Sequence, residues 1–330
     1  MKHLAKLADS LSSATVAVLG DLVVDEFIHG EISRVSREAP VLILKHRGRT
    51  LVPGGAANAI MNLAALGVNV LPVGVVGDDE PGRALIKTFQ RQHIPVSGVQ
   101  KLKGWTTITK TRILAGHSHT SLQQVVRLDR EPDTAPDRHT LRELALALRK
   151  YALASDAVLV SDYGYGAASP EVLHAARSGK RNPFIDLPVT LVSRFRMLQF
   201  NGITSATPNE AEVEAALGVR IGSDEPRLAA CGRKLMERMK LESLVITRGR
   251  DGMALFTDGK KPLSIPVHGS DEAKDVTGAG DTVIAVYTAA LAAGADAEDA
   301  ARLANVAGGI VVMKRGTATV TAAELKSSLA

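Results

Sequence analysis

The amino-acid sequence predicts an α/β protein whose mainly parallel central sheet is covered by helices on both faces. Short apolar runs alternate with segments of helical periodicity along most of the 330 residues. This alternation is typical of βαβ units, which place parallel strands inside and helices outside. With 45% hydrophobic residues the chain can fill one large core. We therefore expect one domain over residues 1–330, with a small accessory element.

The order of the elements follows from the apolar patterns. Residues 15–20 form an apolar run that ends at Gly-Asp, as a buried parallel strand does, and its carboxyl end is where ligands bind in such sheets. A helix is expected at 55–66, ended by Gly67, with a returning strand at 69–74. Further helical patterns and strand-like runs alternate at 80–91, 138–153, 157–160, 170–178, 209–217, 227–239 and 244–247.

Residues 23–49 and 106–128 break this alternation. In the second stretch Ile108, Lys110 and Arg112 recur with the period of a strand. We expect these two segments to form a small sheet that stands off the core.

Composition excludes several other classes of protein. The net charge of +5 comes from dispersed basic residues, and aromatic residues make up only 3%, so we expect no nucleic-acid partner. The single Cys231 and a charged amino terminus without a signal peptide favour the cytoplasm. The longest uncharged stretch, residues 282–295, is too short to span a membrane.

The most specific motif is the string Asp-Val-Thr-Gly-Ala-Gly-Asp-Thr at residues 275–282. It precedes an apolar helix, so its free backbone amides can hold an anion beside the carboxylate of Asp281. An isolated Gly-x-Gly would more simply mark a helix start with a capping Asp, but the full string is more specific.

This string resembles the signature of the ribokinase-type (PfkB) sugar kinases, and residues 20–25 and 53–58 resemble the family's sugar-binding segments. The resemblance spans nearly the whole chain and implies a ribokinase-like fold, in which the two irregular segments form a lid that often pairs in a homodimer. Segments at 33–41, 107–112, 127–129, 161–163 and 207–212 resemble the branch that phosphorylates D-glycero-β-D-manno-heptose 7-phosphate. That branch makes the 1,7-bisphosphate for the lipopolysaccharide core.

The resemblance implies the following site. Asp281 would be the base, and Gly278, Ala279 and Gly280 would supply amides to the transferred phosphate. Asn209 and Glu212 would organise Mg²⁺ and ATP, although they equally fit a capping box. Thr247, Gly249, Gly252 and Asn305 would border the nucleotide, although the glycines also fit turns. Carbonyls around Asp275 and Thr277 could hold a monovalent cation, K⁺ for example.

Sugar contacts are expected from Asp21, Asp25, Gly54, Gly55 and Asn58, since polyols need acceptors, donors and close backbone approach. Tight helix packing is the alternative for the glycines, and a solvated position for Asn58. Arg34, Lys110 and Arg112 would bind the 7-phosphate, with Arg127 as a further candidate.

The sequence departs from this branch at three points. Relatives have Asp-Pro-Lys after an apolar strand where we place Ile185-Asp186-Leu187-Pro188, and a lysine is also missing after Tyr163. Either other basic residues replace these charges, or the substrate differs. Many relatives continue into a nucleotidyltransferase domain, whereas this sequence ends at Ala330, so we expect phosphorylation without adenylylation.

Three functions stay open at this stage. The chain is a heptose 7-phosphate kinase, a related kinase for another sugar or sugar phosphate, or a non-catalytic sugar-binding regulator. The complete Gly-Ala-Gly-Asp motif argues against the regulator. The fingerprints of nicotinamide dehydrogenases and of P-loop enzymes are absent from the sequence.

Overall fold

The computed structural model describes residues 2–116, 122–179, 182–269 and 273–329. Its main body is a nine-stranded sheet with the strand order β13-β12-β11-β10-β9-β8-β1-β4-β5. These strands are β1 (Thr15–Gly20), β4 (Asn69–Gly77), β5 (Val99–Leu102), β8 (Ala157–Asp162), β9 (Val189–Ser193), β10 (Ser205–Ala206), β11 (Ser243–Thr247), β12 (Met253–Thr257) and β13 (Leu263–Ile265).

The predicted parallel sheet is confirmed from β5 to β11, and its centre is buried on both faces. In β1, Val16 and Val18 pack on one side while Ala17 and Leu19 pack on the other. A strand buried on both faces is apolar throughout, which is why this run was easy to recognise. The sequence did not predict the edge beyond β11, where β12 and β13 pair in antiparallel fashion.

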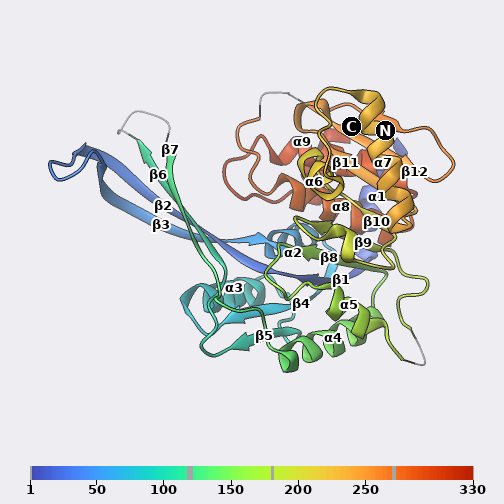
Figure 1. Ribbon diagram of the computed structural model, residues 1–330, viewed down its shortest axis with the longest axis horizontal. Coiled ribbons are helices and arrows are strands. Elements are labelled where there is room, and N and C mark those ends of the chain that lie inside the picture. The colour runs from blue at the N-terminus through green and yellow to red at the C-terminus, as the bar shows by residue number, and fades with distance from the viewer. Residues whose placement is uncertain (1, 117–121, 180–181, 270–272, 330) are drawn as a thin grey trace.

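Helices cover both faces of the sheet (Figure 1). One core cluster includes residues of α1, α2, α3, α8, α9 and α10, and the other includes residues of α4, α5, α6 and α7. The bounds are α1 (Lys2–Ser10), α2 (Ala56–Ala65), α3 (Glu80–Arg91), α4 (Arg138–Ala152), α5 (Pro170–Arg177), α6 (Glu210–Leu217), α7 (Glu225–Met239), α8 (Ala279–Ala292), α9 (Ala297–Val311) and α10 (Ala322–Leu329). Among the described residues, no helix is long and apolar enough to cross a membrane.

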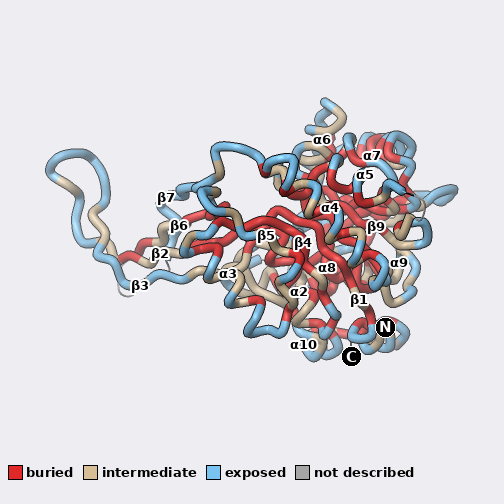
Figure 2. The backbone as a smooth tube through the Cα atoms, turned by 90° about the horizontal axis from the view of Figure 1, so that it is seen from below, coloured by how far each residue is buried: buried red, intermediate tan, exposed pale blue. Residues whose placement is uncertain are grey.

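The two irregular segments form a separate four-stranded sheet with the order β3-β2-β6-β7, which we call the lid. Its strands are β2 (Leu22–Val35), β3 (Leu42–Gly55), β6 (Thr109–Gly116) and β7 (Gln123–Arg130), and residues 117–121 of the expected lid lie outside the described residues. All its pairs are antiparallel except β2 with β6. The far end of the β2–β3 hairpin is exposed (Figure 2).

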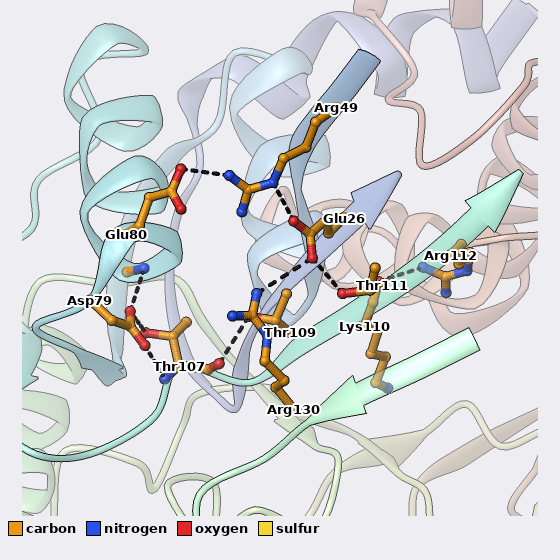
Figure 3. Close-up of polar contacts among 11 residues, drawn as sticks. Glu26, Arg49, Asp79, Glu80, Thr107, Thr109, Lys110, Thr111, Arg112 and Arg130 are labelled. Atoms are coloured by element: carbon orange, nitrogen blue, oxygen red, sulfur yellow. Dashed lines mark hydrogen bonds and ion pairs between the residues drawn. The ribbon is translucent and has the colours of Figure 1, made fainter. Parts of the chain in front are cut away.

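A buried carboxylate joins the base of the lid to the main body. Glu26 on β2 accepts hydrogen bonds from Arg49 on β3 and Thr111 on β6, and it forms an ion pair with Arg130. Arg49 also reaches Glu80 at the start of α3, at 2.7 Å. Figure 3 shows this chain of contacts, which links all four lid strands to the main body on the face of β6 opposite Lys110.

Candidate active site

The glycine turn and α8 form the centre of the candidate site. Gly278 precedes α8 with φ +79°, a conformation in which an alanine would be strained. A Cβ atom on Gly278 would also lie 2.5 Å from the side-chain nitrogen of Asn58. From Asp281 to Ala290 every residue of α8 is buried, as expected for an apolar helix in the core. The helix therefore directs its free amides and positive dipole end into the site.

Asp281, in the first turn of α8, is 5% exposed and held by two donors. The Tyr163 hydroxyl donates to Oδ1 at 2.6 Å, and Asn58 Nδ2 donates to Oδ2 at 3.2 Å. Burial raises the pKa of Asp281 to about 7, although both hydrogen bonds act in the opposite direction. A carboxylate with this pKa can accept a proton from a hydroxyl group near neutral pH.

Asn58 contacts the turn and not an open sugar pocket. Its Nδ2 bonds the carbonyl of Gly278 and Asp281, and its Oδ1 accepts from Asn62. Only 2% of the residue is exposed. Asn58 therefore holds the glycine turn against Asp281, and its direct contact with a sugar stays a prediction.

Asp21 is engaged by backbone donors, and its direct contact with a sugar also stays a prediction. Its two carboxylate oxygens accept backbone hydrogen bonds from residues 163, 165, 167 and 168, at 2.9–3.2 Å. It is fully buried, which raises its pKa to about 6. With both oxygens occupied, Asp21 fixes the loop after β8 that carries Tyr163.

Asp25 is the predicted sugar residue that lies between the lid and the main body. It forms an ion pair with Arg112 and accepts a hydrogen bond from Thr317 at 3.1 Å. A Cβ atom on Gly54 would lie 2.4 Å from its carboxylate, and one on Gly55, which has φ +53°, would meet Val23. The two glycines are thus required by close packing around Asp25 and the start of α2.

The lid brings three of the predicted cations to one face. In the strand register, Lys110 lies opposite Asp25 of β2 and Asp129 of β7, and Arg112 lies opposite Arg127 of β7. Because cross-strand partners share a face, these side chains all lie on the same side as Asp25. Arg34 does not join them: it pairs with Ile43 near the exposed end of the lid. It lies nine residues beyond Asp25, or about 30 Å along the strand.

A cavity of about 530 Å³ lies beside the first turns of α8 and is lined by most of the predicted nucleotide residues. Asn305 Nδ2 donates to the carbonyl of Pro266 at 2.8 Å, and the bridge between Asn209 and Thr247 adjoins the cavity. Apolar side chains on its wall suit a flat base, while the glycines admit phosphates. Its lining includes Thr247, Gly249, Gly252, Met253, Val267, Ala279, Gly280, Val283, Asn305 and Val312.

The two glycines of this cavity differ in their surroundings. Gly249 has φ +57° and open space around its Cα, so it leaves room for a ligand. Gly252 has φ +77°, and a Cβ atom there would lie 2.1 Å from the carbonyl of Ile265. Gly252 therefore also serves as the turn glycine between neighbouring strands, which was the alternative interpretation.

Asn209 and Glu212 form the capping box at the start of α6. The Glu212 amide donates to Asn209 Oδ1 at 2.8 Å, and the Asn209 amide donates to Glu212 Oε2 at 2.9 Å. Burial raises the pKa of Glu212. The cap uses one oxygen of Glu212 and leaves the other, which is compatible with a metal ion held through water.

Asp275 fixes the beginning of the glycine turn. Its carboxylate accepts the amides of Thr277 and Gly316, each at 2.9 Å. These two contacts join the turn to the segment after α9 and lower the pKa of Asp275, although burial opposes them. The side chain is thus engaged, and any cation here would use the backbone carbonyls named in the prediction.

Two residues of the site were not singled out from the sequence. Tyr163 follows β8 directly. Polar residues at the carboxyl ends of parallel strands are expected at a ligand site, as was argued for Asp21 after β1, and the same argument applies to Tyr163. Arg194 follows β9, which places the predicted Ile185–Pro188 segment before this strand and not after it. The comparison with Asp-Pro-Lys was therefore wrong: the cation at this strand end is Arg194. The mixed Val-Thr-Leu-Val-Ser pattern of β9 hid the strand.

Relatives of known sequence place the chain in a family. The family model described as pfkB family carbohydrate kinase matches residues 14–324. Bifunctional protein HldE of Pelobacter propionicus is 38% identical over 333 residues, and that of Geobacter sulfurreducens is 39% identical over 334 residues. The alignments cover 100% and 99% of this chain but 66% and 65% of those proteins. The chain thus spans just under two thirds of these relatives.

Solved structures agree on the fold. Ribokinase of Arabidopsis thaliana, complexed with ribose and ATP, superimposes with a TM-score of 0.74 at 17% identity, covering 96% of this chain and 98% of that chain. Phosphofructokinase-2 of Escherichia coli, in complex with potassium, gives 0.73 at 15% identity over 95% and 97%. The chain therefore has the ribokinase-like fold and belongs to the pfkB family carbohydrate kinases, which are ATP-dependent sugar kinases.

Proposed function

We propose that this protein transfers the γ-phosphoryl group of ATP to the C1 hydroxyl of D-glycero-β-D-manno-heptose 7-phosphate. The product would be the 1,7-bisphosphate used in ADP-heptose and lipopolysaccharide core biosynthesis. The observation that carries the proposal is that Asp281 directly follows Ala279 and Gly280, which line the 530 Å³ cavity, and accepts a hydrogen bond from Tyr163, whose ring centre lies 4.9 Å from Nζ of Lys110 in the lid. The HldE relatives and the heptose-kinase motifs of the sequence support the choice of sugar.

The chemistry follows from the geometry around Asp281. The acceptor oxygen would attack the γ-phosphorus while the bond to the bridging oxygen of ADP breaks, and Asp281 would take the hydroxyl proton. The amides of Gly278, Ala279 and Gly280 would stabilise the charge that develops on the phosphoryl oxygens. Asp25 would bind sugar hydroxyls, and closure of the lid would exclude water.

Metal ions enter this proposal as partners of ATP. Glu212, with one uncapped oxygen, fits a Mg²⁺ ion held mainly by phosphates and water. For K⁺, the turn between Asp275 and Thr277 offers backbone carbonyls, and the phosphofructokinase-2 neighbour was solved with potassium. These ions would neutralise phosphate charge and order the turn.

The test is ATP-dependent phosphorylation of the heptose 7-phosphate by the wild type and by Asp281→Asn. Fructose 6-phosphate, ribose and fructose serve as competing acceptors. We expect preferred turnover of the heptose phosphate and a loss of about 10² to 10⁴ in kcat for the variant. Preference for another acceptor would reject the heptose assignment but not the kinase, and an active Asp281→Asn would reject Asp281 as the base.

A further inference from the structure

A second cavity, of about 510 Å³, lies between the end of lid strand β7 and the loops that follow β8 and β9. Tyr163 links it to the reaction centre, because its hydroxyl bonds Asp281 while Tyr163 also lines this cavity. No lining residue is shared with the nucleotide cavity. A sugar whose hydroxyl meets Asp281 can therefore extend away from ATP into this space. Its lining includes Arg127, Asp129, Glu131, Tyr163, Tyr165, Arg194 and Phe195.

Lys110 adjoins this cavity as a buried cation whose ammonium forms no ion pair among the described residues, although the charges of its cross-strand neighbours Asp25 and Asp129 partly offset the lowering of its pKa by burial. The residue is only 6% exposed, and within the described parts of the chain no carboxylate lies within ion-pair distance of its ammonium. Its Nζ lies 4.9 Å from the ring centre of Tyr163 and 6.0 Å from that of Tyr165. Burial and the charges of Arg194 and Arg127 lower its pKa. An anion placed here would offset this cost of burying the ammonium.

Arg194, an exposed residue, contributes a second cation from the loop after β9. Its amide donates to the carbonyl of Asp162 at 3.1 Å, and its guanidinium lies 5.3 Å from the ring centre of Phe195. The same loop is fixed by Arg196, which pairs with the buried carboxylate of Asp162 at 2.7 Å. No acidic side chain in the described ranges pairs with Arg194, so its donors are available to a ligand.

Two acidic residues of the cavity, Asp129 and Glu131, are already engaged, whereas Asp133 lies exposed at its edge. Arg127 forms a fork-like pair with Asp129, and Glu131 accepts the Tyr165 hydroxyl at 2.6 Å. The carboxylates of Asp129 and Glu131 add hydrogen-bond acceptors for sugar hydroxyls beside the cations. A different cavity contains Arg112, Lys274 and Arg315, but none of these three is a buried cation without an ion pair, since Arg112 is paired with Asp25 and the other two are exposed. The stronger requirement for an anion is therefore at Lys110.

We propose that Lys110, Arg127 and Arg194 form the subsite for the phosphate at the far end of a sugar phosphate, and that Arg194 determines the preference for phosphorylated acceptors. This rests on the proposed function, since it specifies how that site recognises its acceptor. Arg194 supplies the charge that was missing from the motif comparison. The planar guanidinium suits two phosphate oxygens at once.

The experiment compares Arg194→Gln with the wild type on D-glycero-β-D-manno-heptose 7-phosphate and on the same heptose without phosphate. We expect kcat/KM for the 7-phosphate to fall about ten- to a hundredfold, mainly through KM, while that for the free heptose changes less than about twofold. Arg194→Lys should retain part of the preference. Arg233→Gln, an exposed arginine of α7, is the matched control and should behave as wild type.

An equal loss with both acceptors, or a loss confined to kcat, would overturn the subsite, because Arg194 would then act on the transferred group. Failure of the proposed function gives a different result, because the wild type would then reject the heptose phosphate but phosphorylate fructose 6-phosphate. In that case Arg194→Gln and the wild type are compared on fructose 6-phosphate and fructose instead. A wild type that prefers unphosphorylated sugars would also overturn the subsite. Equilibrium binding of the sugar phosphate to Asp281→Asn, with and without Arg194→Gln, tests the contact without turnover.

Discussion

At the scale of single residues, the state of Asp281 depends on the opposition between burial and two hydrogen bonds. Burial raises its pKa, whereas the donors Tyr163 and Asn58 stabilise the charged form and lower it. The net value of about 7 leaves the base partly charged at neutral pH. Activity should therefore fall about tenfold per pH unit below this value.

The Tyr163 hydrogen bond can be tested through the pH profile. Tyr163→Phe removes a donor that favours the carboxylate, so the acidic limb of kcat/KM should move to higher pH. The measurement is kcat/KM for the sugar acceptor between pH 5 and 9. Tyr151→Phe is the control, because that hydroxyl bonds Ser97 on the other side of the molecule. A limb that stays at the wild-type pH would show that Tyr163 does not act on the base.

The same carboxylate lowers the stability of the folded protein above neutral pH. Its pKa is raised from 3.8 to about 7, so the unfolded chain holds the charge more easily and stability falls as pH rises through this window. Asp281→Asn removes the charge, although its amide would face the Asn58 donor. We expect a gain of about 1–2 kcal/mol at pH 8 that disappears below pH 4. Urea unfolding at both values measures it, and an equal effect at both would contradict this account.

At the scale of elements, the two glycines at the start of α8 have different roles: Gly278 is required by the backbone conformation, whereas Gly280 leaves space for a ligand. Gly278 has positive φ and close contact with Asn58, whereas nothing lies within 4 Å of a Cβ built on Gly280. Gly280→Val should therefore keep the melting temperature within a few degrees but raise KM for ATP more than about tenfold. Gly278→Ala should instead lose roughly 1–3 kcal/mol of stability. Calorimetry and ATP titrations distinguish them, and unfolding of Gly280→Val would refute the assignment.

The sequence predicted these elements well where the pattern was local. The helix at residues 80–91 has the predicted bounds, and the lid strands fall where the alternation breaks. Arg34 could not be placed, because its distance from Lys110 depends on the length of the β2–β3 hairpin. Asp21 and Asn58 both lie near Asp281 in the structure, but periodicity cannot say whether a polar side chain binds a ligand or supports the backbone.

At the scale of the whole molecule, the lid projects from the main body on the side opposite the two termini (Figure 1). Its inner face carries Asp25, Lys110 and Arg112, while its outer face carries Glu26 and its polar partners at the base and apolar side chains farther along β7. Val126 and Leu128 on β7 are 52% and 58% exposed, and they pair with Ile113 and Thr111 away from the cations. Exposed apolar strand surface favours association with a partner.

We therefore predict a homodimer that forms through the outer face of the lid. Replacing Val126 and Leu128 together by Gln should convert the dimer to a monomer, because burial of these side chains would no longer stabilise the interface. Sedimentation at micromolar concentration measures the mass, and circular dichroism checks the fold. The control replaces the exposed Leu146 and Leu153 at α4 by Gln and should stay dimeric. A monomeric wild type would contradict the predicted dimer. A double β7 variant that remains dimeric would place the interface elsewhere.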